Sequence, residues 1–467
     1  PINQITIPET ITSIGAGAFQ GTSLTWVKVP ASVTRIGEKA FGYDADGQPI
    51  AGFTMCVIPG SAAEAYAIAN GFALEYFTET GLRYEILTNP ETSESYVSII
   101  AYDGTDPQLV IPETLQNTPV TEIGYRAFFE NTVITSATLP STLKKVGDRA
   151  FMYTKVGAIN LPAGLEIIEE GAFAKMPNLT SINIPGSVKE LPYMVFWQDT
   201  SLASVTLNNG LEKIGSDVFS GCPMTSLVLP DTLKELNQCS FQNCTSLASI
   251  NFPAGITKIP YACFDNTGLT TLTIPDTIVA IEGAAFSRCA KLTSITLPKT
   301  LTALGEKFGA GVFNECTALT EVNFAANGNL AMIGAFTFNG CTSLTQITIP
   351  DTCTSIEYCA FSGAGLTSID IPASVSSIAN QAFYLCSSLS TITLHEGLTT
   401  VDSMAFTGCA ATEIFLPRSL TSIGDSAFGY VGWSGKVEGF TIRGYAGTAA
   451  QTYAENNGFP FVAVTEP

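Results

Sequence analysis

The stretch LTSIDIPASVSSIANQAFYLCSS, residues 366–388, is one copy of a unit that recurs through almost the whole chain of 467 residues. Each copy closes on a phenylalanine, and these anchor residues make the period countable. Two anchors, Phe19 and Phe41, stand near the start. Fourteen more follow at a mean step close to 23 residues: Phe128, Phe151, Phe173, Phe196, Phe219, Phe241, Phe264, Phe286, Phe313, Phe338, Phe361, Phe383, Phe406 and Phe428. A period of this size predicts a solenoid of stacked coils.

The unit explains why each copy coils. Ile295 and Leu297 alternate with polar residues, which is the pattern of a strand with one buried face. Pro298 ends the strand because it has no N–H to continue a ladder. A second apolar pair, Leu301 and Leu304, leads the chain back toward the next strand. The sequence therefore predicts a leucine-rich-repeat solenoid: a β-rich, curved, right-handed coil with a parallel sheet and repeats of about 23 residues.

Two segments break the repeat and match each other. They are residues 42–72 and 429–459, and matched positions such as Phe53 and Phe440 differ by 387 in number. Each segment carries a capping box and a later glycine suited to end a helix, which predicts helices near 61–70 and 448–457. The capping residues are Ser61 and Glu64 with Gly71, and Thr448 and Gln451 with Gly458. Such helices would cover the end of a solenoid core.

These features predict five parts. Residues 1–41 hold the last two repeats of a truncated first array, and residues 42–77 close it. Residues 78–127 open a second array with a hairpin, over 82–88 and 96–102, and a first coil. Residues 128–428 form the main array, and residues 429–467 close it. Because residues 2–8 already match a repeat strand, we interpret the chain as a segment of a longer exported protein whose targeting and anchoring parts lie elsewhere.

Composition excludes several classes of function. The chain has 41 acidic and 21 basic residues, a net charge of −20. This balance argues against nucleic-acid binding and against attachment to anionic membranes. No apolar run reaches the ~18 residues of a membrane span, so direct membrane insertion is not expected of this segment.

The repeat resembles a known family. The pattern L-x-x-I-x-(I/L)-P, with Ala-Phe-x-x-Cys, is present at Leu292–Pro298 and at 285–289, and it resembles the BspA-like leucine-rich repeats of bacterial surface proteins. The resemblance implies display at the cell surface or secretion, a role in adhesion, and no enzymatic activity. This chain departs from the pattern where Asn208, Ala325 and His395 replace the proline, and where Thr267 and Ala364 replace the cysteine.

Residues with reactive side chains give no catalytic, cofactor or metal site. Seven of twelve cysteines lie three residues after an anchor, which favours small buried thiols stacked in register over a disulfide ladder or a metal site: Cys222, Cys244, Cys289, Cys316, Cys341, Cys386 and Cys409. The single histidine, His395, is expected in a surface turn. The run Asp44-Ala-Asp46-Gly47 lacks the later ligands of a calcium loop and is interpreted as a turn.

Two groups of residues are candidates for partner binding. The first is a column of large side chains just after successive anchors and near them: Phe129, Met152, Tyr153, Tyr193 and Trp197. If this column faces solvent it marks a partner site, and if it faces inward it belongs to the core. The second lies in two long units, at Lys307, Phe308, Asn327 and Asn329, because insertions in a solenoid often form binding loops. Neutral drift in tolerant loops explains the insertions equally well.

The function predicted from these observations is recognition or adhesion, without enzymatic activity, of an extracellular protein or glycan. A structural spacer or stalk that projects another module is the alternative, and a glycan-processing accessory protein is a third. The sequence does not indicate an oligomeric state.

Overall fold

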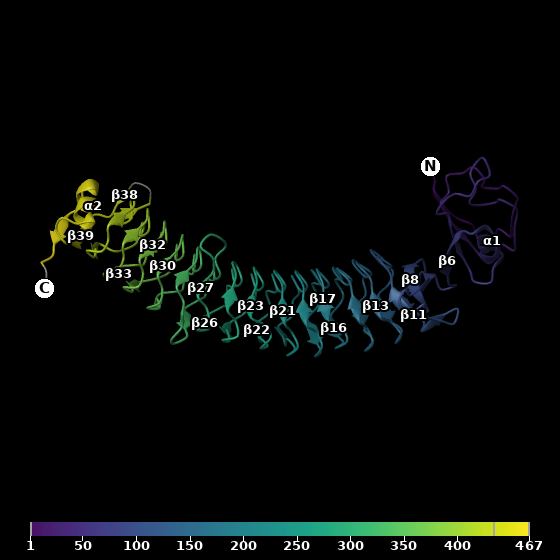
Figure 1. Ribbon diagram of the computed structural model, residues 1–467, viewed down its shortest axis with the longest axis horizontal. Coiled ribbons are helices and arrows are strands. Elements are labelled where there is room, and N and C mark those ends of the chain that lie inside the picture. The colour runs from purple at the N-terminus through teal and green to yellow at the C-terminus, as the bar shows by residue number, and fades with distance from the viewer. Residues whose placement is uncertain (1, 433–434, 466–467) are drawn as a thin grey trace. The chain divides into compact units, whose positions relative to one another are not determined.

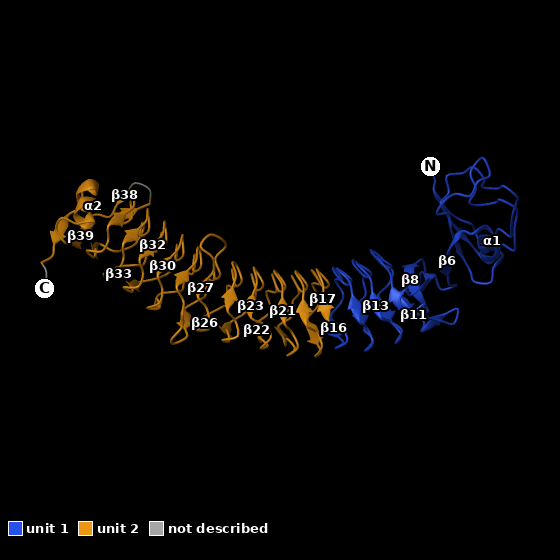
Figure 2. Cartoon of the chain, viewed as in Figure 1, with its two compact units in different colours: residues 1–188 blue, residues 189–467 orange. Residues whose placement is uncertain are grey.

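A computed structural model describes residues 2–432 and 435–465. The chain forms two compact units, Pro1–Val188 and Lys189–Pro467, and their division falls within the predicted main array (Figures 1 and 2). Both units consist of stacked coils joined by parallel strand pairing, so the predicted solenoid is confirmed. Residue 1, in the first predicted part, and residues 433–434 and 466–467, in the last, lie outside the described residues.

Unit 1 contains a sheet of ten strands. Nine follow one another in the order β1 (Gln4–Thr6), β3 (Trp26–Val29), β5 (Thr54–Val57), β6 (Ala73–Phe77), β7 (Leu82–Thr88), β8 (Ser95–Tyr102), β11 (Thr118–Ile123), β13 (Lys145–Val146) and β15 (Ile167–Ile168), and β10 (Thr114–Leu115) pairs with β11. Its shorter ladders join β2 (Ser13–Ile14) with β4 (Arg35–Ile36), and β9 (Gln108–Val110) with β12 (Ser136–Thr138) and β14 (Ala158–Ile159). Strand β16 (Ser181–Ile184) also belongs to this unit.

The predicted hairpin forms as β7 and β8, which pair antiparallel along their length. Strand β7 also pairs antiparallel with β6, where Tyr76 lies opposite Tyr84. The hydrogen-bonded sheet therefore runs without interruption through residues 78–81, where the sequence suggested a boundary between two arrays.

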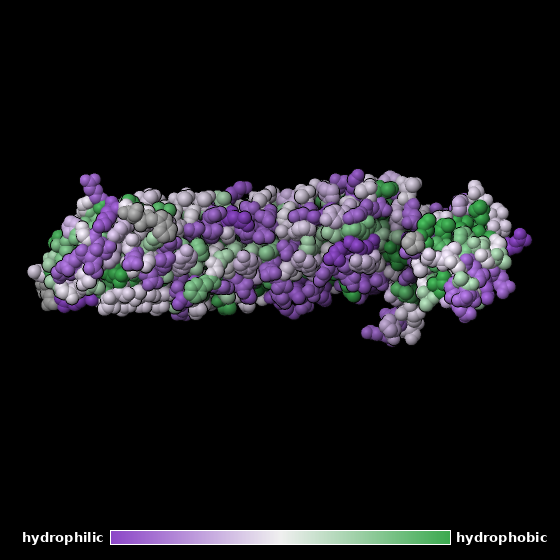
Figure 3. Space-filling view, turned by 90° about the horizontal axis from the view of Figure 1, so that it is seen from above, coloured by the Kyte–Doolittle hydropathy of each residue, from purple (hydrophilic) through white to green (hydrophobic). Residues whose placement is uncertain are grey.

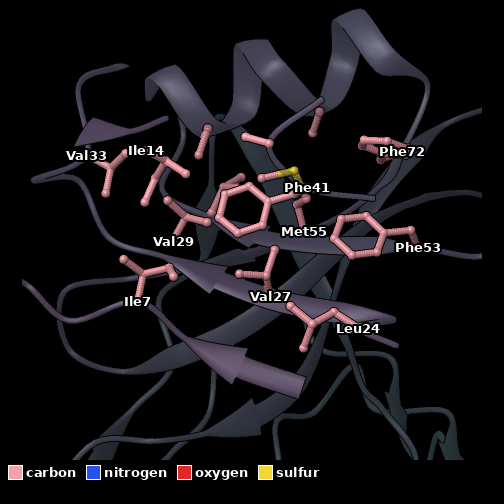
Figure 4. Packing of buried hydrophobic residues seen from close by; sticks show 14 of the residues in the cluster. Ile7, Ile14, Leu24, Val27, Val29, Val33, Phe41, Phe53, Met55 and Phe72 are labelled. Atoms are coloured by element: carbon pink, nitrogen blue, oxygen red, sulfur yellow. The ribbon is translucent and has the colours of Figure 1, made fainter. Parts of the chain in front are cut away.

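The core of the first coils lies between the sheet and helix α1 (Ala62–Asn70), as Figure 4 shows. The Ser61 side chain accepts a hydrogen bond from the Glu64 amide at 3.2 Å, and Gly71 ends the helix with a φ of 71°. The Tyr66 hydroxyl accepts from the Phe41 amide at 3.1 Å and donates to the Phe41 carbonyl at 3.0 Å. In other coils the anchor amide bonds to a neighbouring coil, as the Phe128 amide does to the Ala150 carbonyl, so the Tyr66 hydroxyl takes the place of that neighbour.

Unit 2 repeats the arrangement near its end. Helix α2 (Ala449–Asn457) ends at Gly458, with a φ of 65°, and the Tyr453 hydroxyl bonds to the Phe428 amide and carbonyl, both at 3.0 Å. The predicted cap by the Thr448 hydroxyl is wrong, although the Gln451 side chain accepts from the Gly447 amide at 2.9 Å. The Thr448 hydroxyl donates to the Tyr445 carbonyl at 2.6 Å instead of capping the helix.

Most coils of unit 2 carry a strand at each of two positions, and these strands form two interrupted ladders. The first uses the predicted strands, in which Ile295 and Leu297 are buried: β18 (Ser204–Leu207), β20 (Ser226–Leu227), β22 (Ser249–Ile250), β24 (Thr271–Thr273), β26 (Ser294–Leu297), β28 (Glu321–Phe324), β31 (Ser368–Ile371), β33 (Thr391–Leu394), β35 (Glu413–Phe415), β39 (Thr441–Gly444) and β40 (Phe461–Ala463).

The second ladder uses two-residue strands on the return path, which the sequence did not reveal. They are β17 (Glu190–Leu191), β19 (Lys213–Ile214), β21 (Glu235–Leu236), β23 (Lys258–Ile259), β25 (Ala280–Ile281), β27 (Ala303–Leu304), β29 (Met332–Ile333), β30 (Ser355–Ile356), β32 (Ser377–Ile378), β34 (Thr400–Val401) and β36 (Ser422–Ile423). Strands β37 (Tyr430–Val431) and β38 (Gly435–Lys436) form a small antiparallel pair.

The anchor phenylalanines of unit 2 stack as a column of rings through the core. From Phe196 to Phe428, successive ring centroids lie 4.8–5.7 Å apart. The turn around each anchor also recurs, because residues two before and two after it often adopt left-handed backbone, as at Met194 and Gln198.

Candidate functional site

An aromatic and cationic cluster lies on the turns of three successive coils of unit 1. It consists of Tyr125, Arg126, Phe129, Tyr153 and Lys175, and we call it the aromatic–cationic cluster. Each member lies within three residues of a buried anchor: Phe128, Phe151 or Phe173. The anchor ring points into the core, whereas some of its neighbours in this tight turn, such as Tyr125 and Tyr153, are exposed.

The contacts inside this cluster are specific. The Arg126 guanidinium lies 3.9 Å from the Phe129 ring centroid and 5.6 Å from that of Tyr125. The Phe129 and Tyr153 rings meet edge to face at 5.7 Å, and the Lys175 ammonium lies 5.1 Å from the Tyr153 centroid. Tyr125 is 63% exposed and Tyr153 is 39% exposed, whereas Phe129 is half-buried. These contacts hold the exposed rings in place before a partner arrives.

The charge of Arg126 in this cluster is not neutralised by an ion pair. Within the described ranges, no carboxylate forms an ion pair with Arg126, although the chain carries a net charge of −20. Tyrosine and arginine are the residues that most often contribute strongly to binding at protein interfaces. An exposed guanidinium beside exposed rings can therefore contact an anionic or a planar group of a partner.

The predicted partner column divides between the two units. In unit 1, Tyr153 is exposed, Phe129 is half-buried and Met152 is buried at 9% exposure. In unit 2, Tyr193 is 44% exposed and Trp197 is half-buried. The structure brings Phe129 and Tyr153 into contact, whereas Met152 contributes to the core.

The predicted loop residues separate into two places. Asn327 and Asn329 line a groove of about 590 Å³ in unit 2. Phe308 is 78% exposed, with the Lys307 ammonium 5.8 Å from its ring centroid. Neither Lys307 nor Phe308 is among the residues that line the groove.

Sequence reasoning missed Tyr125, Arg126 and Lys175. The repeat could have indicated Tyr125. When the units are aligned on their anchors, four of the anchors have a tyrosine three residues before them. All four are exposed: Tyr125, Tyr193, Tyr261 and Tyr358. Nothing in the sequence distinguishes Arg126 or Lys175 from other surface cations.

The repeated cysteines have a structural role. All twelve cysteines are free, and the seven that follow an anchor are buried. Each of the seven thiols hydrogen-bonds to the carbonyl of the anchor in the preceding coil at 3.0–3.4 Å, as Cys244 does to Phe219. Burial raises the pKa of the Cys244 thiol to about 12, which suppresses the reactive thiolate.

The remaining candidates are turns. The His395 Nε2 lies 2.7 Å from an Asp370 carboxylate oxygen, and both side chains are exposed. The Asp44 carboxylate accepts from the amides of Asp46 and Gln48, which closes the predicted turn. Among the described residues, no group of three or more His, Cys, Asp or Glu side chains is placed to hold a metal ion. The helices described here are too short to cross a membrane.

The surface drawn in Figure 3 is hydrophilic over much of its area, while hydrophobic residues gather over the amino-terminal coils of unit 1. The first-ladder strands turn short polar side chains outward, such as Ser294 and Thr296 beside the buried Ile295. Such groups solvate a sheet well and rarely dominate binding.

The coils, their stacked anchors and their parallel ladders define a leucine-rich-repeat solenoid. More particularly, the chain belongs to the BspA type leucine-rich repeat family, whose model matches residues 1–46, 121–227, 212–327 and 306–432, more than half of the chain. Proteins of this type generally act in adhesion or recognition and are generally not enzymes.

A solved structure agrees with this assignment. A leucine-rich repeat protein from Bacteroides ovatus ATCC 8483 is 26% identical, with a TM-score of 0.60 over 74% of this chain and 95% of that one. A leucine rich cell surface protein from Faecalibacterium prausnitzii A2-165 is 21% identical, with a TM-score of 0.43 over 76% of this chain and 95% of that one. None of the curated proteins is significantly similar to the chain.

Proposed function

We infer that the chain is a non-enzymatic recognition or adhesion protein, secreted or displayed at the cell surface, that binds an extracellular protein or glycan through its solenoid surface. The aromatic–cationic cluster carries this proposal. It presents exposed tyrosine rings and an arginine without a carboxylate partner among the described residues, on a chain with a strong net negative charge.

The family supports the same role. BspA type repeats generally serve adhesion or recognition, and one similar solved structure is of a cell surface protein. Burial raises the pKa of the Cys244 thiol and suppresses its reactive thiolate, so the proposal rests on the exposed turns.

Binding of the purified chain to arrays of extracellular matrix proteins and glycans tests the proposal. A Tyr125→Ala/Tyr153→Ala variant removes the exposed rings of the cluster. A Tyr261→Ala/Tyr358→Ala variant is the matched control, because these tyrosines are also exposed on anchor turns but lie in unit 2.

We expect a specific ligand whose affinity falls at least tenfold in the first variant and is unchanged in the control, since two central contact residues typically contribute more than this. Equal binding by both variants would show that the cluster is not the site. No specific ligand at micromolar concentration would overturn the proposal in favour of a structural spacer.

A further inference from the structure

The first ladder of unit 2 is interrupted after β18, β22, β28 and β33, and the interruption at β28 leaves an open strand edge beside a groove. This strand is the last of a three-stranded sheet with β24 and β26, and its ladder pairs it with β26 alone. The corresponding segment of the following coil, residues 345–350, forms no strand. Elsewhere the same coils stack normally, as the Glu315 amide bonds to the Asn339 carbonyl at 2.7 Å.

Inserted residues lie at this interruption. Ala325 stands where most units have proline, and the loop after it is long. The Asn329 amide bonds back to the Lys299 carbonyl at 3.3 Å, and Asn327 adopts left-handed backbone with a φ of 58°. The loop is therefore held against the preceding coil, on one side of the interruption.

The groove of about 590 Å³ lies at this opening. Its lining includes Val322 and Phe324 on one side and Thr348 and Ile349 on the other. Val322 and Phe324 are half-buried, whereas the equivalent residues of β26, Ile295 and Leu297, are at most 1% exposed. Apolar side chains at positions that are buried in β26 thus border the groove.

Backbone groups also border the groove. The amides of Glu321 and Ala325 bond to the preceding coil. Because successive residues of a strand direct their backbone groups to opposite sides, those of Val322 and Phe324 face the groove. Within the described ranges, no backbone hydrogen bond joins these two residues to the following coil.

The charge at this edge is negative. Asp351 is the one charged residue among those that line the groove, and Glu321 lies at the start of β28. The nearby Lys299 ammonium pairs with Asp276 at 3.0 Å, so its charge is balanced. A ligand that carries a positive charge is therefore favoured.

We propose that this groove binds an extended peptide segment of a partner protein, which adds a strand to the open edge of β28. The peptide supplies backbone donors and acceptors to Val322 and Phe324, alternate apolar side chains to the groove, and a lysine or arginine to Asp351. An unpaired strand edge is a template for such pairing. This site lies apart from the aromatic–cationic cluster and does not depend on it.

The test uses a displayed library of seven-residue peptides panned against the full chain, followed by synthesis of the enriched peptides. Each peptide is also made with alternate backbone nitrogens methylated, which keeps the side chains and removes strand hydrogen bonds. Thr348→Trp fills the groove. Thr273→Trp is the matched control, because Thr273 is exposed at the same repeat position on β24, which pairs with β26.

We expect enriched peptides with alternating apolar residues and a basic residue. Their affinity should fall at least tenfold on methylation and in Thr348→Trp, and stay unchanged in Thr273→Trp and in Tyr125→Ala/Tyr153→Ala. Hydrogen exchange at Val322 and Phe324 should be fast in the free chain and slow with peptide.

Failure to enrich any peptide, equal binding of methylated peptides, or protected Val322 and Phe324 amides in the free chain would overturn the proposal. Protection of this edge by a neutral oligosaccharide alone would overturn it in favour of a glycan site.

Discussion

Replacing Phe264 with alanine is expected to destabilise the central coils of unit 2 by about 4–5 kcal/mol, the upper part of the range for a buried phenylalanine. The Phe264 side chain is fully buried. Its ring stacks on Phe241 at 5.4 Å and on Phe286 at 5.5 Å, and it meets Phe252 edge to face at 5.9 Å. Each aromatic pair contributes roughly 0.5–1.5 kcal/mol beyond its buried area, so the loss of three pairs places the effect in this upper part.

Native-state hydrogen exchange measures this loss coil by coil. Because each coil of a solenoid contacts mainly its neighbours, the amides of Phe241 and Phe264 should lose most of their protection, while that of Phe406 should change little. Phe308→Ala is the control, since Phe308 is 78% exposed and should change stability by less than about 0.5 kcal/mol. A loss below about 1 kcal/mol in Phe264→Ala, or an equal loss along the whole unit, would refute the stacked-anchor reasoning.

Three further changes test other parts of the structure. Gly429→Ala should destabilise the closing segment by more than about 3 kcal/mol, measured by thermal unfolding, because its φ is +76° and the new Cβ would lie 2.5 Å from an aromatic ring. Tyr453→Phe should cost about 2–3 kcal/mol in the same assay, because the buried Phe428 amide and carbonyl lose their hydroxyl partner; a cost below about 0.5 kcal/mol would contradict the role assigned to that hydroxyl. Burial raises the pKa of Cys244 to about 12, against 9.0 for an ordinary thiol, so the thiol of the unfolded chain ionises at lower pH than that of the folded chain. The free energy of unfolding should therefore fall above pH 9, by about 1.4 kcal/mol per pH unit for this group. Urea unfolding at pH 8 and pH 10 should show a smaller fall in Cys244→Ala than in the parent chain.

The fold was predictable because its signal is periodic. The anchor step, the alternation around Ile295 and the proline after the strand all reflect one coil, and repetition averages out local exceptions. The hairpin was predictable from two strand-like runs around a polar loop. These features depend on residues that are near one another in sequence.

Features that depend on the neighbouring coil were not predictable. The two-residue strands of the second ladder, such as Ala303–Leu304, are too short to leave an alternating pattern. Left-handed backbone occurs at Met194 and Cys239, residue types that do not favour it, because stacking against the next coil sets the turn. Thr448 has the sequence of a helix cap, but the nearby Tyr445 carbonyl takes its hydroxyl.

The candidate site was predictable in part. Phe129 and Tyr153 stood out as large residues beside anchors, but their exposure depends on how tightly each turn packs, so buried Met152 could not be separated from them. The groove at β28 was indicated only by the length of its unit. That the following coil fails to pair with β28 is a tertiary property and leaves no local mark.

The seven repeated thiols and the anchor amides of stacked coils reach only an adjacent coil, as Cys244 does with Phe219 and Phe241 does with Cys263. Removal or duplication of one whole unit would therefore leave every surviving turn with a neighbour of the same kind. Unequal recombination between such similar units can change the reach of the protein in whole steps while the fold persists. Length, in this architecture, can evolve separately from the chemistry of any single turn.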